Sequence, residues 1–312
     1  MTGFQFNQIK ATTKYCGVLG FPIKHSGSPA MHNPAMEDMG LDWNYLAFEV
    51  PPNQLKEVLN GAKHMGFVGM NLTVPHKLLA LDMMDHLDAS AKRWGAVNTV
   101  RFEGKSSGGN WVPVWQLNSD EFSETRMIGY NTDANAVIRA IKEDLSIELN
   151  GKSVILLGAG GAGRVAALKL ADEKVADLYL VNRTVEKCHE LKEFIDHNYQ
   201  GIHTNVGYPG KNSNIDLIIN ATSLGLKPND SLPFDQTAID FSKIRYAFDM
   251  IYQPPETPFL KLAKEHGCQI ANGLGMLLYQ GVAALEIWSQ QKVPVDVMKK
   301  ALHQHVYKKA CS

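Results

Sequence analysis

Short apolar runs alternate with amphipathic stretches along most of the chain. Buried strands are predicted by the apolar runs at 15–21, 43–50, 67–74, 96–102, 151–157, 178–181, 215–220 and 246–249. Helices are predicted by the stretches at 29–39, 54–65, 78–87, 133–145, 163–171, 185–196 and 258–265, and by a tail, 275–305, that breaks in two near Pro294. Strands that alternate with helices indicate an α/β fold with mainly parallel sheets covered on both faces.

The alternation is interrupted between Glu103 and Arg126. This segment is rich in Ser, Gly and Asn and has no long apolar period, so it predicts an extended hairpin or a mobile loop. A second α/β unit begins near Asp133, and the terminal helices are expected to pack back on the first unit. We therefore predict two α/β domains, one of residues 1–132 plus 273–312 and one of residues 133–272.

Charge and cysteine content exclude several functional classes. The chain has 312 residues, with 31 basic against 32 acidic side chains, so bulk charge does not favour nucleic acid or an acidic membrane as a partner. The four cysteines form no CxxC pair, and His303 and His305 have no evident partner ligand, so we expect no metal site. No apolar run reaches the roughly 18 residues of a membrane span, and residues 1–10 lack a signal-peptide core. These features predict a cytoplasmic protein.

A glycine-rich loop between a buried strand and an Ala-rich helix is the strongest local signal. The string runs Gly158-Ala159-Gly160-Gly161-Ala162-Gly163. In this setting the first glycine allows the tight turn, the second lets a pyrophosphate approach the backbone, and the third lets helix and strand pack closely. The helix N-terminus offers its N–H groups to phosphate. We predict a Rossmann-type dinucleotide-binding domain; the alternative is a glycine turn that holds no ligand.

The residues after the next predicted strand favour NADP over NAD. An NAD enzyme usually places a carboxylate there for the ribose 2′-hydroxyl, whereas this chain has Asn182, Arg183 and Thr184, with Lys187 one turn later. Arginine can hold a phosphate with two donors. We therefore predict that these residues bind the 2′-phosphate of NADP, although exposed bases are also common on protein surfaces.

Several strings resemble motifs of the shikimate dehydrogenase family. In the family's order, and together with the glycine loop, they span about residues 17–290: HSGSP (25–29) with His32-Asn33, NLTVPHK (71–77), GAVNT (95–99), GYNTD (129–133), NATS (220–223), FDMIY (248–252) with Thr257-Pro258, and NGLGM (272–276) with Gln280. Gly27 departs from the family, which often has a long or basic residue there, and segment 103–126 is longer than the usual connection.

The resemblance implies that 3-dehydroshikimate and NADPH react to give shikimate and NADP, a step of chorismate and aromatic amino-acid biosynthesis. It also makes Lys77 and Asp133 the catalytic pair. An ammonium group can protonate the oxygen that receives negative charge when a hydride reaches a ketone. Without the family, Lys77 would be interpreted as a surface lysine and Asp133 as a helix N-cap.

By the same resemblance, the remaining site residues divide into two sets. The substrate is a carboxylic acid with ring hydroxyls, and the residues expected to bind it are Ser26, Ser28, Thr73, Asn98, Tyr252 and Gln280. Thr222, Met250, Gly273 and Met276 are expected to join the glycine loop in binding the cofactor. Each has a structural alternative: Ser28 could be a helix N-cap with Pro29 as the first helical residue, Asn98 a loop bracket, and the methionines core residues.

Three functional hypotheses stay open from the sequence. The first is an NADP-dependent shikimate dehydrogenase, whose substrate-binding catalytic domain is 1–132 plus 273–312. The second is a quinate/shikimate dehydrogenase that uses NAD or both cofactors. The third is a regulator that senses NADP without catalysis, which would not need Lys77 and Asp133. Either a monomer or a homodimer is compatible with the sequence.

Overall fold

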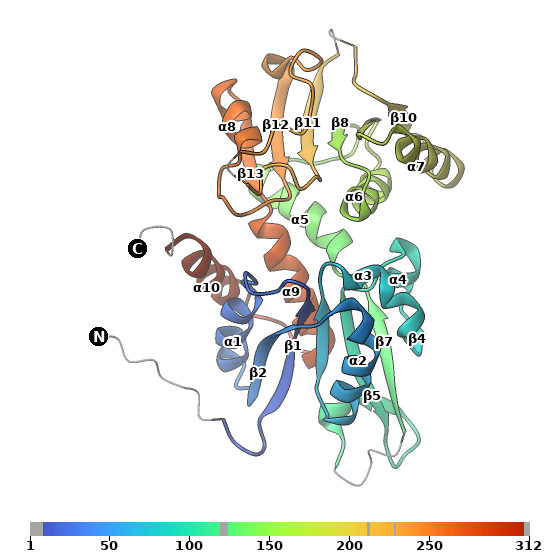
Figure 1. Cartoon of the computed structure of the whole chain (residues 1–312), viewed down its shortest axis with the longest axis vertical. Helices are drawn as coiled ribbons and strands as arrows, with labels where there is room; N and C mark the ends of the chain where they lie inside the picture. Colours follow the sequence, from blue (N-terminus) through green and yellow to red (C-terminus); the bar gives the residue numbers. More distant parts are fainter. Residues whose placement is uncertain (1–8, 119–123, 211–212, 228, 309–312) are drawn as a thin grey trace. The chain divides into compact units, whose positions relative to one another are not determined.

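The computed structural model describes residues 9–118, 124–210, 213–227 and 229–308. The chain forms two compact units, Met1–Thr132 with Gly281–Ser312, and Asp133–Gln280 (Figure 1). The second boundary lies inside helix α9 (Leu274–Ser289), later than the predicted residue 273. Both units are α/β, as predicted. None of the described helices is long and apolar enough to cross a membrane.

The first unit is built on a mixed sheet with the strand order β2-β1-β3-β5-β7-β4 and with β6 paired to β5. Its strands are β1 (Lys14–Gly20), β2 (Trp43–Glu49), β3 (Gly69–Leu72), β4 (His86–Leu87), β5 (Thr99–Lys105), β6 (Trp111–Pro113) and β7 (Thr125–Tyr130). Strand β5 runs antiparallel to β3, β6 and β7, and the other pairs are parallel. The interrupted segment is therefore a hairpin extension of β5 and β7; its residues 119–123 lie outside the described part.

Two local predictions for this unit are wrong. The helix expected at 78–87 is a single turn, α3 (His76–Leu79), followed by a 3-10 turn and β4. Pairing of β4 with β7 replaces the helical pattern, while Leu81, Met83, Met84 and Leu87 still pack on the core. Ser28 is the first residue of α1 (Ser28–Asp38) rather than its cap; Gly27 takes the cap position without a side-chain hydrogen bond.

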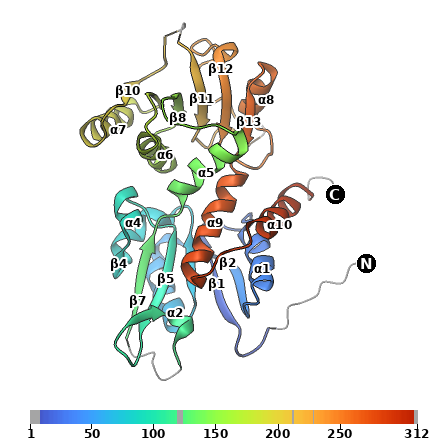
Figure 2. The same cartoon turned by 180° about the vertical axis from the view of Figure 1, so that it is seen from behind.

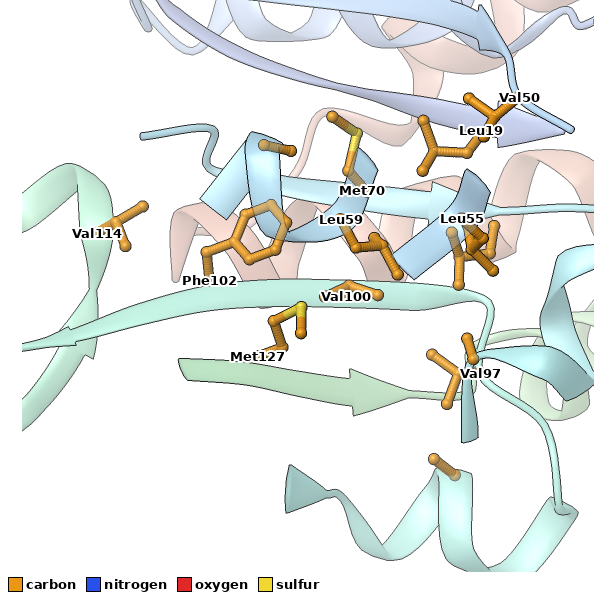
Figure 3. Packing of buried hydrophobic residues seen from close by; sticks show 14 residues of the cluster. Leu19, Val50, Leu55, Leu59, Met70, Val97, Val100, Phe102, Val114 and Met127 are labelled. Atoms are coloured by element: carbon orange, nitrogen blue, oxygen red, sulfur yellow. The ribbon is translucent and has the colours of Figure 1, made fainter. Parts of the chain in front are cut away.

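The two faces of the first sheet are covered differently. One face packs on α2 (Leu55–His64), and Phe102 rises from β5 toward Leu59 in this core (Figure 3). On the other face, Trp288 of α9 donates from Nε1 to the carbonyl of Val100 at 3.0 Å. Helix α10 (Val295–Lys308) lies beside α1 (Figures 1 and 2), so the terminal helices pack back on this unit as predicted. The unit also contains α4 (Ala89–Trp94) and 3-10 turns at Pro52–Gln54, Leu81–Met83 and Val114–Gln116.

The second unit has an all-parallel sheet with the strand order β10-β9-β8-β11-β12-β13. Its strands are β8 (Ser153–Leu157), β9 (Asp177–Val181), β10 (His203–Val206), β11 (Ile215–Asn220), β12 (Ile244–Asp249) and β13 (Gln269–Asn272). Its helices are α5 (Asp133–Leu145), α6 (Gly161–Asp172), α7 (Val185–Asn198) and α8 (Pro258–Glu265), with a 3-10 turn at Phe241–Lys243. In chain order the strands lie 3-2-1-4-5-6, which is the Rossmann arrangement with its reversal point between β8 and β11. Strands β10 and β13 had not been predicted.

Removal of a large core side chain should destabilise the first unit strongly. Phe102 has 0% of its surface exposed and lies in the cluster between β5 and α2. We expect Phe102→Ala to lower the free energy of unfolding by about 3–5 kcal/mol, because it leaves a cavity. Urea denaturation monitored by tryptophan fluorescence measures this change. Met65→Ala is the control, because Met65 is 71% exposed, and it should cost less than about 0.5 kcal/mol.

Candidate functional site

One edge of the first sheet gathers most of its predicted substrate residues. Ser26 and Ser28 follow β1, and Thr73 follows β3. Because β5 is antiparallel to β3, the residue that precedes it, Asn98, lies at the same edge as the carboxyl ends of the parallel strands. Thr132, which follows β7, reaches this edge too. Ligands of open α/β sheets bind outside this edge.

Backbone hydrogen bonds between neighbouring segments fix the positions along the edge. The N–H of Thr73 donates to Leu19 O at 3.0 Å, and that of Leu72 donates to Asn98 O at 2.8 Å. The N–H of Asn98 donates to Tyr130 O at 3.0 Å. Backbone hydrogen bonds therefore hold the segments that carry Thr73 and Asn98 to their neighbours along this edge.

Lys77 is attached to the same edge. It is the second residue of α3, and its carbonyl accepts a hydrogen bond of 2.9 Å from the N–H of Val97, the neighbour of Asn98. The side chain of Lys77 is only partly buried, so an ammonium group keeps some solvation there. The backbone of Lys77 is thus anchored beside a predicted substrate residue, and the role of its side chain as a proton donor stays a prediction.

Asn98 is held in a fixed orientation. Its Oδ1 accepts from the backbone N–H of Thr132 at 2.8 Å, and its Nδ2 donates to Thr132 Oγ1, also at 2.8 Å. Since a backbone N–H can only donate, the amide oxygen of Asn98 must face Thr132 N. Asn98 therefore does bracket two loops, and its role as a substrate ligand stays a prediction. Asp133 follows Thr132 directly in the chain, so this bracket also fixes the start of α5.

The buried side chain of His32 is hydrogen-bonded to the backbone of the serine loop, the segment that carries Ser26 and Ser28. His32 Nδ1 donates to the carbonyl of Ser28 at 2.8 Å, and its ring stacks on Tyr45 at a centroid distance of 4.1 Å. The N–H of Ser28 in turn donates to Ser26 Oγ at 3.3 Å. Burial lowers the pKa of His32 to about 4, so the imidazole is neutral at physiological pH. His32 belongs to a motif seen in the sequence, but the motif alone predicted no role for it.

His32 should contribute to the acid lability of the fold. Between pH 6.5 and about 4 the unfolded chain takes up a proton on His32 that the folded chain does not, so stability falls as the pH falls. A pKa shift of this size corresponds to about 3 kcal/mol in the free energy of unfolding. We expect His32→Phe to lose less stability than the wild type between pH 7 and pH 4, as measured by chemical denaturation. The matched variant His64→Phe, at an exposed position, should lose as much as the wild type.

The glycine loop of the second unit has the geometry of a phosphate cradle. Gly158 has φ +106°, and a Cβ there would lie 3.0 Å from Ala221 O. A Cβ on Gly163 would lie 2.0 Å from Gly158 O, so glycine is required for α6 to approach this closely. The N–H of Ala159 donates to Asn182 Oδ1 at 3.1 Å, which ties the loop to the end of β9. Asn182 thus shapes the loop, in addition to its predicted part in cofactor binding.

The N-terminus of α6 is open to a ligand. Gly160, Gly161 and Ala162 are exposed, and a Cβ added to Gly160 or Gly161 would meet no described atom within 4 Å. Within the described residues, Gly160 caps the helix without a side-chain hydrogen bond. Helix N–H groups that face open space fit a pyrophosphate.

The positions for the 2′-phosphate are also accessible. Arg183 and Thr184 are exposed between β9 and α7, beside the loop that Asn182 ties to Ala159, and Lys187 is exposed in the first turn of α7. Residues 182–184 include no carboxylate that would repel a phosphate. Together with the open helix terminus, these donors fit NADP.

The other predicted cofactor residues line the same edge of the second sheet. The N–H of Met250 donates to Asn220 O at 2.9 Å, and a Cβ on Gly273 would lie 2.0 Å from Met250 O. Thr222 donates from Oγ1 to Asn220 Oδ1 at 2.8 Å. The end of β11 therefore lies beside the glycine loop at the reversal point, where dinucleotides bind in this fold, and the ends of β12 and β13 follow along the same edge.

The buried carboxylate of Asp249 holds the loops of this edge together through hydrogen bonds. Its carboxylate accepts hydrogen bonds from Thr257 Oγ1 at 2.6 Å, Asn220 Nδ2 at 3.1 Å and Ile251 N at 3.0 Å. Burial raises the pKa of Asp249 above its usual value, while these three donors oppose the rise. The matching strings in the sequence included Asp249, Asn220 and Thr257, but nothing in them separated residues that hold the loops from residues that meet a ligand.

Three predicted catalytic or substrate residues, Asp133, Tyr252 and Gln280, belong to the second unit, as does the predicted cofactor residue Met276. Asp133 opens α5, and Tyr252 follows β12. Met276 and Gln280 lie on α9, where Gln280 Nε2 donates to Leu277 O at 2.8 Å. Burial raises the pKa of Tyr252, so its phenol stays neutral. Assembly of these residues with Lys77 around one substrate stays a prediction. No group of three or more potential metal ligands occurs among the described side chains.

Family models match three parts of the chain. Residues 18–100 match the shikimate dehydrogenase substrate binding domain, residues 139–226 match shikimate / quinate 5-dehydrogenase, and residues 273–303 match the shikimate 5'-dehydrogenase C-terminal domain. The first of these contains the serine loop, Lys77 and Asn98, and the second contains the glycine loop.

Whole-chain relatives agree with these matches. A shikimate dehydrogenase (NADP(+)) of Methanopyrus kandleri is 36% identical over 303 residues, which cover 96% of this chain and 98% of the relative. A crystal structure of a shikimate dehydrogenase in complex with NADP+ has a TM-score of 0.80 at 35% identity, covering 97% of this chain and 99% of that one.

Two further structures bear on the ligand. The Thermus thermophilus enzyme, in complex with NADP(H) and shikimate, has a TM-score of 0.76 at 33% identity and covers 93% and 99% of the two chains. A 5-ketofructose reductase of Gluconobacter has the same score at 32% identity and covers 94% and 99%. Similarity along nearly the whole length, joined to the two edges described above, shows that this chain belongs to the shikimate dehydrogenase family.

Proposed function

We propose that this protein is an NADP-dependent shikimate dehydrogenase that reversibly reduces 3-dehydroshikimate to shikimate. The observation that carries the proposal is the edge of the first sheet, where Lys77 is hydrogen-bonded through its backbone to the segment that bears Asn98. Relatives 36–39% identical along nearly the whole chain have this name. The activity would place the protein in aromatic amino-acid biosynthesis.

The chemistry requires a proton donor beside a bound ketone. NADPH, bound at the edge of the second sheet, would supply the hydride. Lys77 would donate its ammonium proton to the ketone oxygen, and Asp133 would orient Lys77 and bind the adjacent hydroxyl. In the oxidation of shikimate the same amine would take the proton back.

Recognition of the acid would divide between its two ends. Ser26 and Ser28 would hold the carboxylate by donating from their hydroxyls, with Tyr252 nearby. Thr73, Asn98 and Gln280 would bind ring hydroxyls. The bracket on Asn98 supports this division, because hydrogen bonds to Thr132 from both ends of its amide group fix the orientation in which Asn98 would meet a ring hydroxyl.

The cofactor assignment depends on the residues after β9. Exposed Arg183 and Lys187, with Thr184 between them, suit a 2′-phosphate, and the open N-terminus of α6 suits the pyrophosphate. Thr222, Met250, Gly273 and Met276 would complete the binding site.

We also propose a cytoplasmic location. Cys16, Cys188 and Cys268 are all free and buried, which fits a reducing compartment.

A quinate/shikimate dehydrogenase is the second candidate, because one matching family model covers both acids. Quinate has an additional hydroxyl beside its carboxylate, so it would need space at the serine loop. Steady-state kinetics with shikimate, quinate, NADP+ and NAD+ separate the two candidates. We expect the highest kcat/KM for shikimate with NADP+; a preference for quinate with NAD+ would reverse the assignment. Tight binding of NADPH without turnover of either acid would instead indicate a regulator.

Loss of the catalytic amine should abolish most of the turnover. We expect Lys77→Ala to lower kcat for shikimate oxidation by about 10²–10⁴-fold, because an acid–base group is removed, with a smaller change in KM. Lys56→Ala, at an exposed position on α2 of the same unit, should keep the wild-type kcat. A Lys77→Ala enzyme that turned over at the wild-type rate would exclude the role given to this residue.

Loss of the guanidinium should weaken binding of the phosphorylated cofactor selectively. We expect Arg183→Ala to raise the KM for NADPH by at least about tenfold and to change that for NADH much less, since a charge-assisted contact to phosphate contributes about 1.5–3 kcal/mol. Lys261→Ala, at an exposed position on α8, serves as the charge-matched control. Equal changes for both cofactors would show that Arg183 does not contact the 2′-phosphate.

A further inference from the structure

Helices α5 and α9 are held together beside Gln280, within the second unit. Tyr279, the residue before Gln280 on α9, donates from its hydroxyl to Glu143 on α5, and only 4% of Tyr279 is exposed. The Cζ atom of Arg139 lies 4.1 Å from the centre of the Tyr279 ring, and Arg139 Nε donates to Glu143 Oε1 at 2.7 Å. Tyr279 is therefore held by its oxygen and by the face of its ring, and α5 supplies both contacts.

A second contact, one turn earlier, involves the same face of α9. A Cβ on Gly275 would lie 2.4 Å from Asp144 Oδ2 and 3.1 Å from Ala140 Cβ, so the two helices approach closely there. Gly275 and Tyr279 are four residues apart and therefore share one face of α9. Two contacts on one face hold the helix against rotation about its own axis and against sliding along α5.

The side chain of Gln280 is tied to its own helix. Its Nε2 donates to the carbonyl of Leu277, in the preceding turn of α9, at 2.8 Å. A carboxamide has a second N–H and an oxygen beyond that bond, and both suit a ring hydroxyl. Because Gln280 follows Tyr279 by one residue, about 100° round the helix, the contacts of Tyr279 on α5 decide the direction in which this amide points.

We propose that Tyr279 is a positioning residue, which directs the Gln280 amide toward the substrate through its hydrogen bond to Glu143. The inference rests on the proposed function, in which Gln280 binds a ring hydroxyl. Neither Tyr279 nor Glu143 belongs to the strings that resembled the family. Burial and the hydrogen bond to Glu143 raise the pKa of Tyr279, so the phenol keeps its proton and remains the donor.

Removal of the Tyr279 oxygen tests the proposal. Tyr279→Phe deletes the hydroxyl and keeps a ring for Arg139. We expect the KM for shikimate, and its Kd by calorimetry, to rise about 3–10-fold, because the hydrogen bond from Gln280 is misdirected, with kcat within about twofold. Tyr246→Phe is the matched control, since Tyr246 lies in the same unit with Arg245 5.1 Å from the centre of its ring, and it should keep the wild-type KM.

Variants of Glu143 separate the hydrogen bond from the charge. Glu143→Gln keeps an acceptor oxygen for the phenol and should keep the KM for shikimate within about twofold of the wild type. Glu143→Ala removes the acceptor and should reproduce the rise seen with Tyr279→Phe. Equal changes in KM for the two Glu143 variants would overturn the proposal.

A double-mutant cycle shows whether Tyr279 acts through Gln280. If it does, Tyr279→Phe/Gln280→Ala binds shikimate no more weakly than Gln280→Ala alone. Independent, multiplicative losses overturn the proposal, as does a Tyr279→Phe enzyme that melts at a lower temperature but keeps the wild-type KM and Kd. Calorimetry is run well below the melting midpoint of each variant, so that folded protein is compared.

Failure of this inference can be told apart from failure of the proposed function. A wild type that oxidises shikimate, with a KM that Tyr279→Phe leaves unchanged, overturns the inference alone. A wild type that neither binds nor oxidises shikimate overturns the proposed function, and the inference with it.

Discussion

The antiparallel strand β5 between β3 and β7 is the constraint on which the substrate edge depends. In an all-parallel sheet, residues that precede a strand lie at the edge opposite the ligand. Because β5 runs the other way, Asn98 at its start comes beside the segments that follow β3 and β7. The same reversal lets the carbonyl of Lys77 meet the N–H of Val97. The segments that carry Lys77 and Asn98, the proposed proton donor and a proposed substrate residue, are thus brought together by backbone pairing.

The second unit reaches a similar result by different means. Its sheet is parallel throughout, so every loop at the ligand edge follows a strand. Close approach at this edge is possible because two positions lack a side chain: a Cβ on Gly163 or on Gly273 would lie 2.0 Å from a carbonyl oxygen. Asn182 and Asp249 then tie loops from different strands together. The edge is therefore shaped before any ligand is bound, which limits the entropy that binding costs.

The sequence predicted the strongly periodic parts of the fold well and the strand pairing poorly. Strand β8 and the glycine loop after it could be predicted, because local composition determines both. The helix predicted at 78–87 failed because pairing of His86 and Leu87 with β7 is a tertiary contact that no local pattern records. Direction was also hidden: residues 96–102 indicated a strand but not that it runs antiparallel. The packing of Tyr45 and His32 could not be predicted, since their rings stack across separate segments and Tyr45 donates to Asn71 on a third.

The buried hydrogen bonds that link Tyr45, Asn71, Thr99 and Asn98 have a consequence for how the site tolerates change. Buried hydroxyls and amides stabilise a fold little in net terms, but one left without its partner costs about 1–3 kcal/mol. Tyr45, Asn71 and Thr99 lie on three strands, so any shift of one strand against another would break a link. The network therefore holds the strands in register and, at the same time, helps to fix the orientation of the Asn98 side chain. Apolar residues could fill the same volume, but Asn98 would then lose the hydrogen bond from Thr99 and would be oriented by Thr132 alone.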